Sequence, residues 1–316
     1  MFISFILLFV GFILLIKGAN FLIDGSSALA SRLNIPQIVI GLTIVAFGTS
    51  TPEFIVNVFA AIEGTNDVGF GNVVGSNIIN IFLILGVAAI IYPLQTQKNT
   101  VWKEIPFTLL GALVLLVMCN DLLFNSEENY ISTGDGIVLL FFFAIFMVYI
   151  FGITEVKSEN IVEVEDFSIL KISLLVLTGL AGLIIGGNLV VNSAVNIATN
   201  WGVSQRVIGL TIVALGTSLP ELFTSAVAAK KGKADIAIGN VVGSNIFNVF
   251  FVLAITTIIK PIPFKPVMNI DLVVMSIASM LLFFTMFTGE KRKIDRWEAA
   301  IFLILYFSYT IWLLMN

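Results

Sequence analysis

Apolar residues gather in ten stretches of this 316-residue chain, each long enough to cross a lipid bilayer as one helix. A crossing needs about 20 predominantly apolar residues. Charged residues make up only 11% of the chain and the mean hydropathy is +1.06, which leaves almost no sequence for a water-soluble domain. We therefore expect an all-α membrane protein with ten transmembrane helices, at 2–24, 36–62, 68–92, 102–120, 132–153, 168–192, 204–230, 235–259, 267–288 and 296–315.

Basic residues are shared unevenly between the loops. If the ten spans alternate in direction, twelve Lys and Arg residues lie on one side and only three on the other. This positive-inside bias predicts that both termini are outside and that the acidic segment 154–167 is cytoplasmic, in the cell membrane. The segment is too short for a folded sensor domain, so we expect a solvated tether between two halves, 1–153 and 168–316.

An internal duplication relates these halves. Gly41–Pro93 aligns without a gap on Gly209–Pro261, at an offset of 168 positions, and 29 of the 53 aligned residues are identical. Each half then holds five helices. Because five is odd, the second copy enters the membrane from the opposite side, which predicts inverted-topology repeats of the kind found in secondary transporters.

The duplicated segment carries an acidic residue in the middle of an apolar helix. The first copy reads GLTIVAFGTSTPEF and the second GLTIVALGTSLPEL, so Glu53 and Glu221 are placed at membrane depth. An ionisable side chain at a helix centre costs roughly 2.5–3.5 kcal/mol on insertion scales. A purely structural role gains nothing from such a residue, so the repeated glutamates are candidate functional groups.

A proline precedes each glutamate and predicts a break in helices 2 and 7. Pro52 and Pro220 cannot donate a helical hydrogen bond, which frees the carbonyl groups of Gly48 and Gly216 four residues earlier, and glycine at those positions makes the break easier. Irregular backbone at membrane depth is tolerated only where it faces protein or a watery cavity. Its carbonyl oxygens are then available as cation ligands.

Hydroxyl and amide side chains surround the glutamates in the sequence. Thr49 lies one helical turn before Glu53, as Thr217 does before Glu221, and a serine follows each threonine. The next spans contain GNVVGSNIIN and GNVVGSNIFN, which place polar stripes at Asn72, Ser76 and Asn80 and at Asn240, Ser244 and Asn248. Oxygen ligands of this kind suit calcium, whereas zinc and copper favour Cys or His.

Other small or charged residues in the spans have simpler interpretations. The pairs Gly71/Gly75 and Gly239/Gly243 are typical of close helix packing. Lys17 and Asp24 have no charged counterparts in the second half, so an ion pair or interfacial snorkelling explains them without a transport role.

Two facing glutamates would place about two negative charges in a low-dielectric pocket. Burying an unpaired charge costs at least several kcal/mol, so an empty pocket is costly to close. A calcium ion or several sodium ions would neutralise it. If access switches only when the charge is compensated, the two ions must exchange rather than leak.

The paired GTS-x-PE and GNVVGSNI-x-N segments resemble the two alpha repeats of the cation/calcium antiporter superfamily, particularly its prokaryotic sodium/calcium exchangers. The resemblance covers the whole chain. It implies electrogenic exchange by alternating access, with three sodium ions for one calcium ion, while the first and sixth helices slide against an ion-holding core.

The resemblance also implies a set of ligands. Calcium would be held by Glu53, Glu221 and the carbonyl groups of Thr49 and Thr217. Sodium sites would use Ala46, Ser50, Ser76, Ala214, Ser218 and Ser244, with Asn80 and Asn248 lining the middle. Some members of the family carry Asp at the position of Asn248, and by analogy the amide here removes a negative charge and argues against potassium co-transport.

Three alternatives remain at this point. A calcium/proton exchanger would load protons on the same glutamates, but the hydroxyl and carbonyl groups beside them favour sodium, since a proton needs no coordination shell. A channel could use the same oxygens, although inverted halves suit alternating access better. An enzyme is the least favoured class, because the chain has no His, no Gly-x-Ser-x-Gly elbow and no phosphate-binding loop.

We expect calcium, sodium and lipid as the partners, with no cofactor, nucleic acid or obligatory protein partner.

Overall fold

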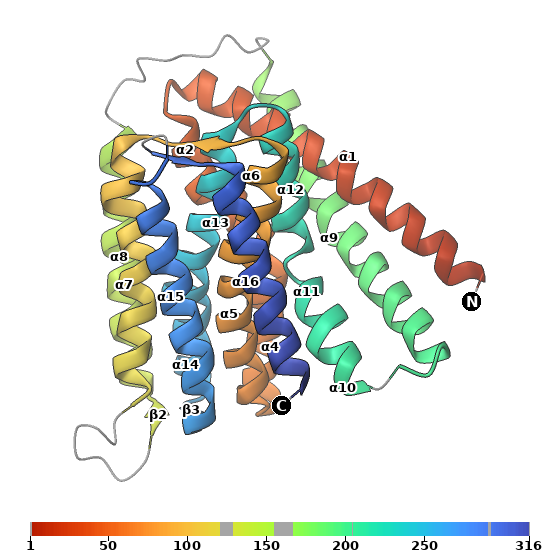
Figure 1. Ribbon diagram of the computed structural model, residues 1–316. Helices are drawn as coiled ribbons and strands as arrows, with labels where there is room; N and C mark the ends of the chain where they lie inside the picture. Colours follow the sequence, from red (N-terminus) through yellow and green to blue (C-terminus); the bar gives the residue numbers. More distant parts are fainter. Residues whose placement is uncertain (1, 121–128, 155–166, 204, 290–291, 316) are drawn as a thin grey trace.

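The computed structural model describes residues 2–120, 129–154, 167–203, 205–289 and 292–315, and helices dominate this part of the chain (Figure 1). Most of the predicted acidic linker, 155–166, lies outside the described residues. Figure 1 shows a bundle of upright helices beside which two long helices cross at a slant. Both chain ends are in the lower half of that view, towards the end that holds α10 (Gln205–Ile208).

Eight helices in the described part are long and apolar enough to cross a membrane, or nine if one bent pair counts as a single span. The protein is therefore a predominantly helical, multi-pass membrane protein, as expected. The bent pair covers Gln37–Thr49 and Thr51–Glu63, with 46° between the two pieces. The segment 205–230 is not among these spans because it is divided into short pieces, of which α12 is the longest at 12 residues.

The first half contains the following elements. They are α1 (Phe2–Leu33), α2 (Gln37–Ile40), η1 (Gly41–Val45), α3 (Ala46–Thr49), α4 (Thr51–Glu63), α5 (Asn66–Ile78), η2 (Ile79–Leu85), α6 (Gly86–Ile91), β1 (Leu94–Gln95), η3 (Thr100–Glu104), α7 (Ile105–Met118), β2 (Tyr130–Ile131) and α8 (Thr133–Thr154). The η1, η2 and η3 segments are π-helical turns within longer helices.

The second half repeats much of this order. Its elements are α9 (Ile169–Asn200), α10, η5 (Gly209–Val213), α11 (Ala214–Gly216), α12 (Leu219–Lys230), α13 (Ala234–Phe247), η6 (Asn248–Leu253), α14 (Ala254–Ile259), β3 (Ile262–Pro263), η7 (Pro266–Met268), α15 (Asn269–Thr285), β4 (Lys293–Ile294) and α16 (Arg296–Met315). The π-helical segments η5 and η6 fall at the same places in the repeat as η1 and η2. Single π-turns inside α-helices are frequent at functional sites.

Two short antiparallel ladders add a feature that the all-α expectation lacks. Strand β1 pairs with β4, and β2 pairs with β3, two residues each. Each ladder joins one half of the chain to the other. They are too short to alter the helical class, but they tie together loops at the ends of the bundle (Figure 1).

The helices at the centre of the bundle are the two that carry the Gly-Asn-Val-Val-Gly-Ser-Asn motif. In the spans Asp67–Ile91 and Ala234–Ile259, 72% and 78% of the most apolar window is buried, against 22–39% in the other six spans. A span that is apolar on every side and buried is surrounded by protein rather than lipid. The duplicated segments therefore form the core that the remaining helices enclose.

Helices α1 and α9 lie against each other through glycines. A Cβ atom added to Gly18 would lie 2.8 Å from the carbonyl oxygen of Gly179, and one added to Gly179 would lie 2.9 Å from the carbonyl oxygen of Gly18. Gly11 and Gly186 meet in the same way. Small residues of this kind let helix backbones approach within a membrane. Both helices have 32 residues, longer than the predicted spans, because they continue through polar residues beyond the apolar stretch.

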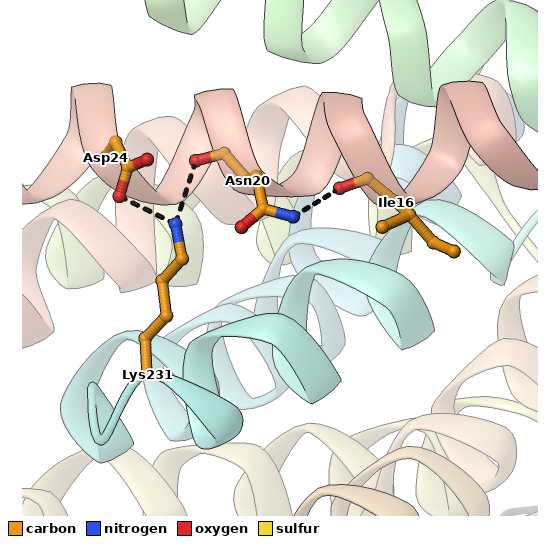
Figure 2. A network of polar contacts seen from close by, with 4 residues as sticks. All are labelled: Ile16, Asn20, Asp24 and Lys231. Atoms are coloured by element: carbon orange, nitrogen blue, oxygen red, sulfur yellow. Dashed lines mark hydrogen bonds and ion pairs between the residues drawn. The ribbon is translucent and has the colours of Figure 1, made fainter.

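The charged residue Asp24 on α1 forms an ion pair, which is one of the two roles that the sequence suggested for it. Lys231, in the turn after α12, reaches up to α1, with its Nζ atom 2.7 Å from Asp24 Oδ1 and 3.5 Å from the carbonyl oxygen of Asn20 (Figure 2). Asn20 in turn donates to the carbonyl oxygen of Ile16. Lys17 is exposed. Partly exposed pairs contribute about 0–1 kcal/mol, so this one orients α1 more than it stabilises it.

The glycine contact predicts a sharp difference between two equally conservative substitutions. Gly18→Ala places a methyl group against the backbone of α9 and should lower the melting temperature in detergent, since overpacking typically costs about 1–3 kcal/mol. Gly152→Ala on α8 is the control, because no described atom lies within 4 Å of a Cβ added there. An unchanged melting temperature for Gly18→Ala would show that α1 and α9 are not held this closely.

Candidate ion-binding site

Two helices break at equivalent positions, immediately before the repeated glutamates. Helix α3 ends at Thr49 and α4 begins at Thr51, with Ser50 between them at φ −83° and ψ 6°. Ser218, 168 positions later, has φ −88° and ψ 4° at the start of α12. The prolines are at the beginning of the new helices, where the missing N–H group has no helical partner to lose. The break thus places a serine hydroxyl at the junction and a glutamate in the first turn beyond it.

Glu53 and Glu221 lie together in the interior, each with 1% of its surface exposed. Ser218 Oγ donates to Glu53 Oε1 at 3.3 Å, and Ser50 Oγ donates to Glu221 Oε1 at 2.8 Å. Each serine therefore contacts the glutamate of the opposite half. The second carboxylate oxygen of each glutamate is buried and has no hydrogen-bond partner among the described residues. The two acidic groups also repel each other electrostatically.

A second layer links the threonines to the polar stripes on α5 and α13. Thr49 donates to Asn240 Oδ1 at 3.0 Å, and Thr217 donates to Asn72 Oδ1 at 3.3 Å. These two contacts are again related by the 168-residue offset. The stripe serines are close by, since Ser218 Oγ is 3.3 Å from Ser76 Oγ and Ser244 Oγ is 3.5 Å from Glu221 Oε1.

The alanines expected to supply carbonyl groups begin the helices that end at the breaks. Ala46 is the first residue of α3, and its carbonyl oxygen accepts from Ser50 N at 3.0 Å and from Thr49 Oγ1 at 3.3 Å. A cation at this carbonyl would have to displace the threonine hydroxyl. Ala214 is the first residue of α11, and its side chain lies outside what the structure describes.

Asn80 and Asn248 are both buried in the central helices, at the π-helical segments η2 and η6. Asn80 Nδ2 donates to Asn245 Oδ1 at 2.9 Å, and Asn248 Nδ2 donates to Asn77 Oδ1 at 3.2 Å. Sequence reasoning did not single out Asn77 and Asn245. Their identity in both copies of the GSN motif was the available signal, but the helical spacing of the polar stripe drew attention to its other members.

The glycines near the breaks leave room for side chains of α9. A Cβ atom added to Gly48 would lie 2.4 Å from Leu180 Cδ2, and one added to Gly216 would lie 2.5 Å from Val191 Cγ2, both on α9. A larger residue at either position would therefore displace the α9 side chain that lies against the broken helix. The expectation that glycine eases the break stays a prediction.

The predicted close packing at the Gly-Asn-Val-Val-Gly motif is found in one copy. A Cβ atom on Gly239 or Gly243 would lie within 3 Å of the backbone that begins the first broken helix. For Gly71 and Gly75 no described atom lies within 4 Å of an added Cβ atom. Gly71 is exposed and Gly239 is buried, so the two copies have different surroundings.

Taken as chemistry, the site presents two carboxylates with hydroxyl and amide oxygens around them. No group of three or more His, Cys, Asp or Glu side chains that could hold a metal ion is found within the described residues. Hard cations such as sodium and calcium prefer oxygen ligands of this kind, and unlike transition metals they do not need nitrogen or sulfur.

Comparison with known proteins agrees with this chemistry. The pattern of the family described as sodium/calcium exchanger protein matches residues 3–152 and 171–315, which is nearly the whole chain in two parts. This chain belongs to the sodium/calcium exchanger family. The resemblance inferred from the paired motifs is therefore confirmed, and the protein is a transporter-family member rather than an enzyme.

Relatives match this chain along nearly its full length. It is 37% identical over 295 residues to the putative antiporter CaxA of Alkalimonas amylolytica, covering 90% of each chain. It is 30% identical to the sodium/calcium exchanger MaX1 of Methanosarcina acetivorans, covering 90% of this chain and 91% of the other. A solved structure of the sodium-calcium exchanger NCX_Mj has 34% identity and a TM-score of 0.83, covering 96% of both chains.

The contact between Ser50 and Glu221 leads to a prediction about cation affinity. Ser50→Ala removes the hydroxyl that contacts Glu221 and that the resemblance assigns to a sodium site. Interactions with charged groups contribute about 1.5–3 kcal/mol, so the apparent affinity for sodium should fall roughly tenfold or more. Thr51→Ala is the control, because among the described residues the Thr51 hydroxyl bonds to the carbonyl oxygen of Phe47 within the same broken span. Sodium-dependent thermal stabilisation measures both variants, and equal midpoints would contradict the assignment of Ser50 to the site.

Proposed function

We propose that this protein exchanges sodium for calcium across the cell membrane by alternating access, electrogenically, with three sodium ions for each calcium ion. The observation that carries the proposal is the buried glutamate pair, in which each acid accepts a hydrogen bond from a serine of the opposite half. Family membership and the likeness to NCX_Mj support the same conclusion.

The proposed ligands follow the contacts of the site. Calcium is held by Glu53 and Glu221 together with the carbonyl groups of Thr49 and Thr217. Sodium ions use Ala46, Ser50, Ser76, Ala214, Ser218 and Ser244, and Asn80 and Asn248 line the middle. The unpartnered carboxylate oxygens of the two glutamates support this assignment, since a buried anionic oxygen without a partner is costly unless a cation or a donor meets it.

Coupling follows from the electrostatics of this pocket. Two ionised glutamates that share an interior site repel each other, and closing protein around them without a counter-ion carries a large desolvation cost. One calcium ion compensates both charges, and several sodium ions do the same. Because the reorienting step needs compensated charge, the site returns across the membrane only with a cargo of the other ion.

Unequal exposure of equivalent residues supports alternating access. Thr49 and Asn240 are completely buried, whereas their counterparts in the duplication, Thr217 and Asn72, are half-buried. Gly71 is exposed while Gly239 is buried. The site is thus more open towards the end of the molecule where α5 begins than towards the end where α13 begins. In a transporter built from two similar halves, equivalent residues differ in exposure in this way when one access path is open and the other is closed.

We further propose that ten spans form two inverted five-helix repeats, 1–153 and 168–316, joined by a cytoplasmic linker, with both termini outside. The tenth span in this arrangement is the interrupted segment 205–230. The reciprocal contacts support the inversion. Under a two-fold axis, if position i of the first half contacts position j of the second, then position j of the first half contacts position i of the second. The positive-inside bias supports the orientation.

Calcium flux into proteoliposomes tests the function. Vesicles loaded with sodium and diluted into sodium-free medium should take up radioactive calcium, and the uptake should persist when an ionophore collapses the pH gradient. Uptake driven by a pH gradient without sodium would establish the calcium/proton exchanger instead. Calcium flux that needs no ion on the other side would indicate a channel, and added potassium tests for co-transport.

Neutralising either glutamate should abolish exchange. Glu53→Gln or Glu221→Gln keeps the shape of the side chain but leaves one negative charge where calcium needs two, so sodium-driven calcium uptake should fall to background. Glu63→Gln is the matched control, because Glu63 is an exposed residue at the end of the same helix as Glu53. Melting temperatures without ions should show that all three variants fold. Retained exchange in Glu53→Gln would exclude that residue as an essential ligand.

A further inference from the structure

Four asparagines form a closed set of contacts between the central helices of the two halves. Besides the bonds from Asn80 to Asn245 and from Asn248 to Asn77, the side chains of Asn77 and Asn245 reach across to each other's backbone. Asn77 Nδ2 donates to the carbonyl oxygen of Asn245 at 3.3 Å, and Asn245 Nδ2 donates to that of Asn77 at 3.4 Å. All four side chains are buried, with at most 2% of their surface exposed.

The backbone carbonyl determines the orientation of every amide in this set. A carbonyl oxygen can only accept a hydrogen bond, so the side chain of Asn245 must turn its NH₂ group towards Asn77. Its Oδ1 atom then faces Asn80 and can only accept, which requires Asn80 to present Nδ2 on that side. The Oδ1 atom of Asn80 is left pointing the other way.

The same constraint fixes the other two amides, with the roles of the halves exchanged. Asn77 is fixed by the carbonyl oxygen of Asn245, and its Oδ1 atom fixes Asn248. As a result, the Oδ1 atoms of Asn80 and Asn248 take no part in these contacts. Both are buried without a hydrogen-bond partner among the described residues. The second oxygens of Glu53 and Glu221 are in the same state.

We propose that Asn77 and Asn245 are positioning residues that force Asn248 and Asn80 to present oxygen, and not NH₂, to the transported cation. The assignment rests on the exchange function proposed above. An asparagine amide is nearly symmetric in shape, so packing alone cannot choose between its two orientations. A cation distinguishes them strongly, since the oxygen attracts it and the NH₂ group repels it. The relay of hydrogen bonds from a backbone carbonyl makes that choice before the ion arrives.

A double-mutant cycle isolates this role. Asn245→Ala leaves Asn80 free to turn its NH₂ group towards the ion, so the KM for calcium in sodium-driven uptake should rise about tenfold while the maximal rate stays within about twofold. In the Asn80→Asp background the same Asn245→Ala change should alter KM by less than twofold or lower it. A carboxylate presents oxygen in both orientations, and it gains nothing from facing Asn245 Oδ1. Asn77→Ala with Asn248→Asp is the mirror cycle.

A structural role would give a different pattern. If Asn245 only stabilises packing, Asn245→Ala has the same effect on KM in both backgrounds, and that result overturns the proposal. Ser279→Ala is the control for loss of a buried polar group away from the asparagines, because within the described part of the chain the Ser279 hydroxyl bonds to the carbonyl oxygen of Met275 on α15. Its KM should match that of the wild type.

Thermal stabilisation by calcium or sodium, measured on the same variants without transport, separates this proposal from the exchange function. If the wild type binds cations but does not exchange them, the exchange function fails, and a binding cycle with the pattern above still supports the positioning role. If the wild type exchanges ions and the cycle is additive, the positioning role fails alone. A wild type with neither flux nor cation-dependent stabilisation overturns both.

Discussion

Two carboxylates enclosed within apolar helices are the constraint on which the rest of this structure depends. Each is unfavourable alone in a low-dielectric interior, and their mutual repulsion adds to that cost. The neighbouring features reduce it without removing it. Helix breaks place Glu53 and Glu221 in the first turn of a new helix, where the helix dipole favours negative charge, and a serine of the opposite half donates to one oxygen of each. The remaining oxygens have no hydrogen-bond partner among the described residues, and this is the basis of the proposed cation site. In that proposal the bound cation offsets the cost of burying the two acids, so cation binding and the stability of the fold are coupled.

Much of this architecture follows from the sequence because membrane depth and duplication are strong constraints. The offset of 168 positions places Glu53 and Glu221 at equivalent points, and an apolar helix can hide such residues only by turning them towards protein. Contacts between helices are harder to foresee. Gly48 was expected to ease a break, but its lack of a side chain makes room for Leu180 of a distant helix. Asn77 was missed because its role depends on the backbone of the other half, and a single helix carries no information about that partner. The two short ladders likewise depend on which loops meet.

The duplication also shows what a sequence leaves undetermined. Thr49 and Thr217 stand in nearly identical motifs, yet one is buried and the other half-buried, and Gly71 and Gly239 differ in the same sense. The residue type is the same in both copies at each of these positions, so it does not determine the exposure. Under the proposed alternating access, the difference belongs to one conformation of the transporter. The glycine contacts between α1 and α9 suit such a molecule, because two backbones in direct contact move more readily as one unit than as two.

The crossed pattern of donors and acceptors has a consequence for the origin of the fold. The contacts of Ser50 and Ser218 with the glutamates join residues from different copies, as do the threonine–asparagine and asparagine–asparagine contacts described above. A single ancestral copy would have held an acid without its donor and an amide without its anchor. If the halves are inverted as proposed, two such molecules inserted in opposite directions would have supplied both to each other at once, as a homodimer with dual topology. Gene fusion would then have preserved a working interface, and the aligned positions that now differ between the two copies would be later divergence.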